Sequence, residues 1–117
     1  MTPKRHDRVA PPPASDEWTL RFDNTNAAHG WEQLCKQAGR NTRRAWEALS
    51  TTPRPNPSHE RHHRLKAGLA TAVHGGTVLE QWQYEVTGAG RIWYLVDDAT
   101  RTVWLTFAAT GHPKATD

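Results

Sequence analysis

The stretch VLEQWQYEVTGAGRIWYLVDDATRTVWLTFA, residues 78–108, decides the fold. Its first part places apolar or aromatic side chains on one face of a strand, namely Val78, Trp82, Tyr84 and Val86. Its last part alternates in the same way, with Val103, Leu105 and Phe107. Between them, residues 91–96 are apolar on both faces, as in a central strand. Gly88-Ala-Gly90 and Asp97-Asp98 are turn sequences. The stretch therefore predicts antiparallel strands over 78–86, 91–96 and 101–108.

Upstream of these strands the sequence predicts one strand and a helical hairpin. Residues 17–23 alternate with Trp18, Leu20 and Phe22 as the apolar positions, which indicates a half-buried strand. A helix capped by Asn24 or Thr25 follows, with apolar residues at helical spacing: Ala27, Trp31, Leu34, Cys35 and Ala38. Gly39 closes it, and a second helix capped by Asn41 carries Ala45, Trp46 and Leu49. The prolines of residues 53–57 end that helix.

The segment between the hairpin and the strands has a weaker secondary-structure pattern. Residues 64–73 predict one weak strand, with His74-Gly-Gly76 as its turn. The whole order predicts an α+β fold, in which an N-terminal strand and a helical hairpin pack on an antiparallel sheet of four to five strands. Residues 17–117 form the single domain. Residues 1–16 hold four prolines and five charges, and they predict a disordered leader.

Composition narrows the classes of function. No apolar run approaches the roughly 20 residues that span a membrane, and the N-terminus lacks the apolar region of a signal peptide. Cys35 is the single cysteine, so the chain has no internal disulfide, and its helical pattern predicts a packed core thiol. We expect a cytoplasmic protein with no membrane partner.

Positive charge is concentrated in the middle of the chain. Residues 36–66 hold eight Lys or Arg residues against two acids, whereas residues 67–117 hold three against five. Three histidines, at 59, 62 and 63, lie inside the positive block. Such asymmetry indicates an anionic partner, most commonly nucleic acid. The alternative is a solvated basic helix face.

The order of elements resembles the RelE/ParE superfamily of toxins over about residues 17–114. The matching motifs are His63-Arg-Leu-Lys-Ala-Gly68 before the sheet, Gly90–Asp97 (GRIWYLVD) on the next-to-last strand, and Gly111-His112 near the end. The resemblance implies the toxin of a type II toxin–antitoxin system, neutralised by a cognate antitoxin protein. RelE-like and YoeB-like members cleave mRNA, usually on the ribosome. ParE-like members inhibit DNA gyrase without nuclease activity.

Within that resemblance the YoeB-like subtype is favoured, which implies a metal-independent endoribonuclease with no cofactor. By position His63 matches the general base, Arg91 the phosphate-binding arginine and His112 the acid, and Lys66 would assist Arg91. The residues expected to bind RNA are Arg40, Arg43, Arg44, Arg64, Tyr84 and Lys114. The chain departs from the subtype at Gln83 and Glu85, where YoeB-like toxins carry arginines, and at Pro113, where they carry an aromatic residue.

Other interpretations of these residues stay open. A His/Arg/His set suffices for cleavage through the 2′-hydroxyl, because imidazole can take either proton role near neutral pH. Each residue also has a plainer interpretation. His63 would be a solvated surface histidine, Arg91 a charge that flanks a turn, and His112 part of a frayed tail. Only one of Arg64 and Lys66 is expected to face a shared cleft, and Lys66 is favoured. The rival functions are a gyrase inhibitor and a plain nucleic-acid-binding module.

A zinc site is not expected. His59, His62 and His63 resemble a ligand cluster, but no spaced cysteines or second histidine pair complete a tetrahedral site.

Overall fold

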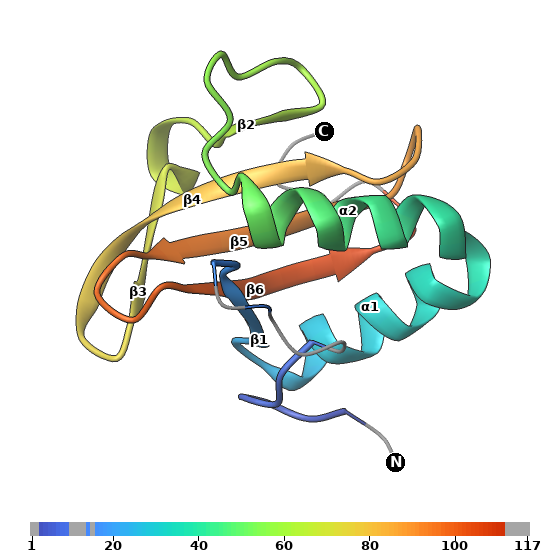
Figure 1. The fold of residues 1–117 in the computed structure, drawn as a ribbon, viewed down its shortest axis with the longest axis horizontal. Coiled ribbons are helices and arrows are strands. Elements are labelled where there is room, and N and C mark those ends of the chain that lie inside the picture. Colours follow the sequence, from blue (N-terminus) through green and yellow to red (C-terminus); the bar gives the residue numbers. More distant parts are fainter. Residues whose placement is uncertain (1–2, 10–13, 15, 112–117) are drawn as a thin grey trace.

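The computed structural model describes residues 3–9, 14 and 16–111 and shows an α+β fold of two helices on one sheet (Figure 1). The elements, in chain order, are β1 (Thr19–Phe22), α1 (Thr25–Gln37), α2 (Gly39–Thr51), β2 (His62–Arg64), the short 3₁₀ helix η1 (Ala67–Leu69), β3 (Thr71–His74), β4 (Thr77–Glu85), β5 (Arg91–Asp97) and β6 (Thr102–Ala109). The predicted helical hairpin and the three predicted C-terminal strands are confirmed.

The sheet is mixed and has six strands, so the prediction of a purely antiparallel sheet of four to five strands is wrong. Its six strands have the order β1-β6-β5-β4-β2, and β3 also pairs with β4. β1 runs parallel to β6, with Thr19 opposite Thr102, while the other pairs are antiparallel. β1 is followed by the helices, and its partner is the last strand of the chain. The alternation of apolar residues within β1 indicates which face is buried. It does not indicate whether β1 runs parallel or antiparallel to β6, which lies far away in the sequence.

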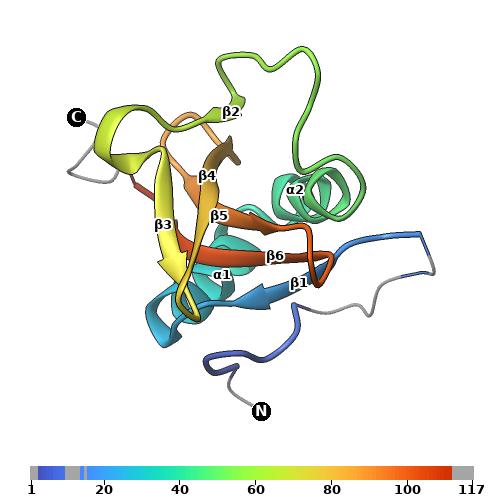
Figure 2. The ribbon, with the colours of Figure 1, turned by 90° about the vertical axis from the view of Figure 1, so that its left-hand side faces the viewer.

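Both helices cover the same face of the sheet (Figures 1 and 2), and the core lies between the two layers. α1 buries Ala27, Ala28, Gly30, Trp31 and Leu34. A Cβ atom on Gly30 would lie 1.7 Å from the carbonyl oxygen of Ala108, so the absence of a side chain lets α1 approach the β6 backbone. Cys35, expected in the core, is exposed beside this buried face.

The junction between the helices differs from the prediction. α1 begins as expected, because Asn24 Oδ1 accepts the Ala27 N–H at 2.8 Å. α2 begins at Gly39, so Asn41 is not its cap. Thr42 is buried instead, and its hydroxyl lies within hydrogen-bonding distance of the carbonyl oxygens of Leu34 and Ala38. Asn41 lies on the first turn of α2 and is half-buried.

The single strand predicted over residues 64–73 is also wrong. β2 pairs with residues 82–84 of β4 and β3 with residues 77–80, both along the same edge of β4. Leu65 and Ala70 both form backbone hydrogen bonds to Gln81 of β4, and residues 66–69 loop out between them, where Ala67 has a positive φ of 53°. The expected turn before β4 is present: Gly75 and Gly76 adopt φ of 57° and 82°, which glycine tolerates best.

Part of the segment predicted to be a disordered leader lies along β1. The N–H groups of His6 and Val9 donate to the carbonyl oxygens of Phe22 and Leu20, at 2.8 and 2.7 Å. The Val9 side chain is 2% exposed and belongs to the core. Residues 6–9 therefore cover the edge of β1 that β6 leaves free.

No helix in the part of the chain that the structure describes is long and apolar enough to cross a membrane.

Candidate functional site

The segment that leaves α2 is held in place by Arg54. Its Nε atom lies 3.0 Å from Glu80 Oε1 on β4, and its two terminal nitrogens lie 2.9 and 2.7 Å from the carboxylate oxygens of Asp98. Arg54 is thereby tied to β4 and to the turn between β5 and β6. This anchoring positions the basic segment of residues 58–66, which follows.

Residues 59–62 form a tight turn into β2. The backbone N–H of His59 donates to the carbonyl of His62 at 3.1 Å, and the reverse hydrogen bond measures 3.0 Å. In β2, His62 lies opposite Tyr84 and His63 opposite Gln83. Because neighbouring strand residues face opposite sides of a sheet, His62 faces the helical layer and His63 faces away from it. The segment therefore contributes side chains to two separate hollows.

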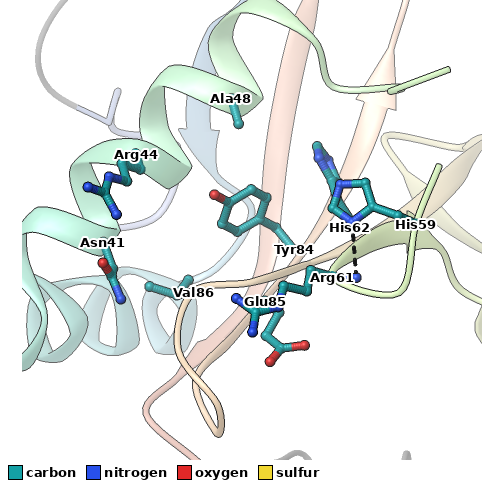
Figure 3. A pocket seen from close by; sticks show the side chains of 9 residues that line it. All are labelled: Asn41, Arg44, Ala48, His59, Arg61, His62, Tyr84, Glu85 and Val86. Carbon is teal, nitrogen blue, oxygen red and sulfur yellow. Dashed lines mark hydrogen bonds between the residues drawn. The ribbon is translucent and has the colours of Figure 1, made fainter. Parts of the chain in front are cut away.

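The first hollow, the α2 pocket, lies where α2 meets β4 and has a volume of about 340 Å³ (Figure 3). It is lined by Asn41, Arg44 and Ala48 of α2, by His59, Arg61 and His62, and by Tyr84, Glu85 and Val86. The second, the His63 hollow, has a volume of about 430 Å³ and is lined by Ser58, His59, Glu60, His63, Arg64 and Lys66. His59 lines both hollows, so they adjoin at this residue.

Tyr84 stands at the centre of the α2 pocket, with its hydroxyl directed toward α2 (Figure 3). Burial raises the pKa of Tyr84, and the nearby charges of Arg44 and Arg61 act in the opposite direction. The phenol is therefore neutral at physiological pH and can donate a hydrogen bond. Two guanidinium groups thus lie near one aromatic hydroxyl.

His62 is 4% exposed and forms the wall behind Tyr84. Its Nε2 lies 2.5 Å from Tyr94 Oη, and Tyr94 donates its only hydroxyl proton to the carbonyl of Pro53 at 2.6 Å. His62 Nε2 must then be the donor to Tyr94. Burial, together with smaller contributions from His59 and His63, lowers the pKa of His62 to about 4. A neutral His62 therefore supports Tyr84, whose ring centroid lies 5.0 Å away.

The two imidazoles of the His63 hollow have complementary proton positions. His63 Nδ1 lies 2.9 Å from the carbonyl oxygen of Arg64, which can only accept, so Nδ1 carries the proton and Nε2 has a free lone pair. His59 Nδ1 accepts the backbone N–H of Arg61 at 3.3 Å, which leaves its proton on Nε2. His63 Nε2 can therefore take a proton, and His59 can give one from Nε2 once its ring has become an imidazolium.

The structure brings together half of the residues predicted from the sequence. His63, Arg64 and Lys66 line the His63 hollow, and Arg44 and Tyr84 line the α2 pocket. Arg64 and Lys66 line the same hollow, so the expectation that only one of them would do so is wrong; residues two positions apart along a strand face the same side.

Other predicted residues lie apart from this group. Arg91 is 8% exposed, and its Nη1 lies 3.1, 3.2 and 3.1 Å from the carbonyl oxygens of Thr87, Gly88 and Gly90. The Arg43 guanidinium stacks over the Trp46 ring, 5.0 Å from its centroid. Arg40 is exposed on the first turn of α2. His112 and Lys114 lie outside the described residues.

Sequence reasoning missed Asn41, His59 and Arg61 as lining residues. The sequence places His59 in the positive block and in an incomplete zinc-ligand cluster, and it indicates Asn41 as a helix cap. The available signal was position, because His59 and Arg61 flank the same basic segment as His63. Among the residues whose placement is described, no three His, Cys, Asp or Glu side chains are grouped to hold a metal ion.

Comparisons with models of protein families, with curated proteins and with solved structures found no match to this chain.

Proposed function

We propose that this protein is an endoribonuclease of the RelE-like toxin type, which cleaves mRNA at the His63 hollow without a metal ion. The observation that supports the proposal is the pairing of two imidazoles, His63 with a free Nε2 and His59 with a protonated Nε2, beside two cations. RNA cleavage through its own 2′-hydroxyl requires a base, an acid and a cationic site for the phosphate. The family resemblance adds the ribosome as the place of cleavage and a cognate antitoxin as the inhibitor.

The proposed reaction is an internal transphosphorylation. His63 Nε2 takes the proton of the 2′-hydroxyl, and the 2′-oxygen forms a bond to phosphorus. The bond from phosphorus to the 5′-oxygen breaks, and His59, first protonated on both ring nitrogens, gives its Nε2 proton to that oxygen and becomes neutral. Arg64 and Lys66 stabilise the charge on the non-bridging oxygens. The products are a 2′,3′-cyclic phosphate and a 5′-hydroxyl. By resemblance, His112 is a second candidate for the acid.

Cleavage assays with paired variants test this proposal. The substrates are free RNA and ribosome-bound mRNA, both in the presence of a chelator, and the readout is the cleavage rate and the chemistry of the ends. His63→Gln and His59→Gln should each lower the rate by about a hundredfold, the typical size of one general acid–base contribution. His29→Gln, which changes an exposed histidine of α1, is the matched control and should cleave normally.

A substrate with one 2′-deoxynucleotide at the cut position should resist cleavage there, because the nucleophile is missing. Cleavage of that position, or wild-type rates in both histidine variants, would show that the reaction does not use this mechanism at this hollow.

One observation favours a second candidate, a nucleic-acid-binding protein without nuclease activity. Arg91, the arginine that the resemblance assigns to the phosphate, donates to the carbonyls of its own hairpin. Binding through Arg44 and Arg61 needs no such residue. RNA binding with no cleavage on or off the ribosome would favour this candidate.

A further inference from the structure

The walls of the α2 pocket combine apolar and cationic groups with one carboxylate, that of Glu85, which lies 3.8 Å from Arg91 Nη2. Ala48, Val86 and the ring of Tyr84 provide apolar surface, and Arg44 approaches from α2 while Arg61 lies across the pocket beside β4 (Figure 3). Asn41 adds an amide, which offers both a donor and an acceptor. A flat, apolar group that carries a nearby negative charge fits such a lining. A nucleotide, with its base and its phosphate, has that chemistry.

The size of the pocket restricts the form of nucleic acid. A volume of about 340 Å³ lies at the low end of small-molecule sites, which span about 300–1,000 Å³. A base paired within an A-form duplex cannot enter it, because its faces and edges are already stacked and paired. An unpaired base can leave the stack and lie against an aromatic ring, and base–aromatic stacking is tolerant of sequence.

The location of the pocket relates it to the proposed cleavage site. His59 lines both hollows, and residues 59–64 run from one to the other. A chain with its phosphate beside Arg64 and Lys66 would place a neighbouring nucleotide at the α2 pocket. The cations Arg44 and Arg61 then continue the positive surface along the same chain.

We propose that the α2 pocket is a nucleotide subsite, which takes one unpaired base of a single-stranded RNA next to the phosphate held in the His63 hollow. The position of the scissile phosphate rests on the proposed function. Binding of the base does not, and it can be measured without cleavage. The subsite makes single-stranded RNA the substrate and excludes duplex RNA.

Fluorescence anisotropy with an uncleavable probe tests the subsite. The probe is a fluorescein-labelled 2′-O-methyl RNA octamer of mixed sequence, used as a single strand and as a blunt duplex. Tyr84→Leu should weaken binding of the single strand about tenfold, the loss expected for one stacked base. The duplex should bind at least tenfold more weakly than the single strand, and Tyr84→Leu should leave its affinity unchanged.

Arginine variants separate pocket contacts from general charge. Arg44→Gln should weaken binding and should reduce the slope of log affinity against log salt by about 0.7, as expected for one lost phosphate contact on a single strand. Arg43→Gln is the matched control, because it removes the same charge from the same helix at a residue that stacks on Trp46 outside the pocket. It should leave the affinity within about twofold.

A second design guards against unfolding of the Tyr84 variant. Ala48→Gln fills the pocket from a half-buried position of α2 with a good helix former and should also weaken binding of the single strand about tenfold. Removal of one base from the octamer should weaken its binding to the wild type. The same removal should not weaken its binding to Tyr84→Leu further, because that variant already lacks the stacking ring.

The outcomes distinguish the two proposals. Equal losses in Arg43→Gln and Arg44→Gln, equal affinity for duplex and single strand, or wild-type binding by Ala48→Gln would each overturn the subsite. Single-strand cleavage that is indifferent to Tyr84 and Ala48 would overturn the subsite and keep the nuclease. Tyr84-dependent binding without any cleavage would keep the base-binding pocket and overturn the nuclease.

Discussion

Among single residues, Arg91 has the densest set of interactions in the β4–β5 hairpin. Three hydrogen bonds from one nitrogen to carbonyl oxygens hold the turn of residues 87–90, and Glu85 lies 3.8 Å from its other terminal nitrogen. We predict that Arg91→Met lowers the free energy of unfolding by about 2 kcal/mol, because three carbonyls of the turn, that of Gly90 buried, lose a charged donor. Urea unfolding at neutral pH measures this loss.

The control for Arg91 is Arg40→Met, which changes an exposed arginine of α2 and should stay within about 0.5 kcal/mol of the wild type. An Arg91→Met protein of unchanged stability and lost RNA cleavage would contradict the structural role. That result would support the phosphate-binding role that the family resemblance implies.

Site residues were predictable where they are neighbours in the chain. His63, Arg64 and Lys66 lie within four positions of one another, so any compact arrangement brings them close. Arg44 and Tyr84 come from different elements, and their meeting depends on how α2 packs on β4. The hydrogen bonds from Arg91 to its own turn were not predictable. Their acceptors are backbone carbonyls, and every turn has backbone carbonyls whatever its sequence.

At the scale of elements, β1 depends on the segment that precedes it. β6 covers one edge of β1, and residues 6–9 cover the other through backbone hydrogen bonds. An uncovered edge strand exposes unpaired backbone groups, and Val9 fills part of the core. We predict that Val9→Ala lowers the free energy of unfolding by about 2 kcal/mol, in line with the burial of one valine side chain. Deletion of residues 1–9 should lower the melting temperature more than Val9→Ala does.

Val73→Ala is the matched control for Val9, because that valine of β3 is 64% exposed and should tolerate the change within about 0.5 kcal/mol. A truncated protein that melts with the full chain would show that residues 1–9 do not contribute to the stability of the sheet.

Elements with strong local patterns were predictable, and long-range pairings were not. Helical spacing and the Asn24 cap located α1, and the apolar run of β5 correctly indicated a strand buried on both faces. The parallel pairing of β1 with β6 joins residues about 80 positions apart in the chain and leaves no trace in either strand's alternation. The interruption between β2 and β3 was hidden because Leu65 and Leu69 continue an apolar pattern through it.

At the scale of the whole molecule, the α2 pocket lies on the line where the helical layer meets the sheet, and the His63 hollow adjoins it at His59. α2, residues 59–64 and β4 come together there. Under that line His62 links the layers: its imidazole donates to Tyr94 of β5, and Tyr94 donates to Pro53 just beyond α2. Trp82 and Tyr84 of β4 and His59 of the turn also face the ring. Stability of the entire fold is therefore coupled to the protonation of one buried histidine.

The pKa of His62 is lowered from 6.5 to about 4 by burial first, and then by His59 and His63. Between these values the unfolded chain binds a proton that the folded protein excludes, so a fall in pH favours unfolding. The stabilisation is complete above pH 6.5 and is lost progressively as the pH falls toward 4. We predict that the free energy of unfolding decreases by about 2 kcal/mol between pH 7.5 and pH 5 from this group.

The measurement is urea unfolding at half-unit steps of pH from 7.5 to 5, which lies above the range where most carboxylates titrate. His62→Gln should be less stable at every pH, but its stability should change less across this range, since the imidazole is absent. The difference between the two curves isolates His62 from the other histidines. Parallel curves for the two proteins would mean that His62 accepts a proton in the folded state as readily as in the unfolded chain. The link from His62 through Tyr94 to Pro53 would then not depend on a neutral imidazole.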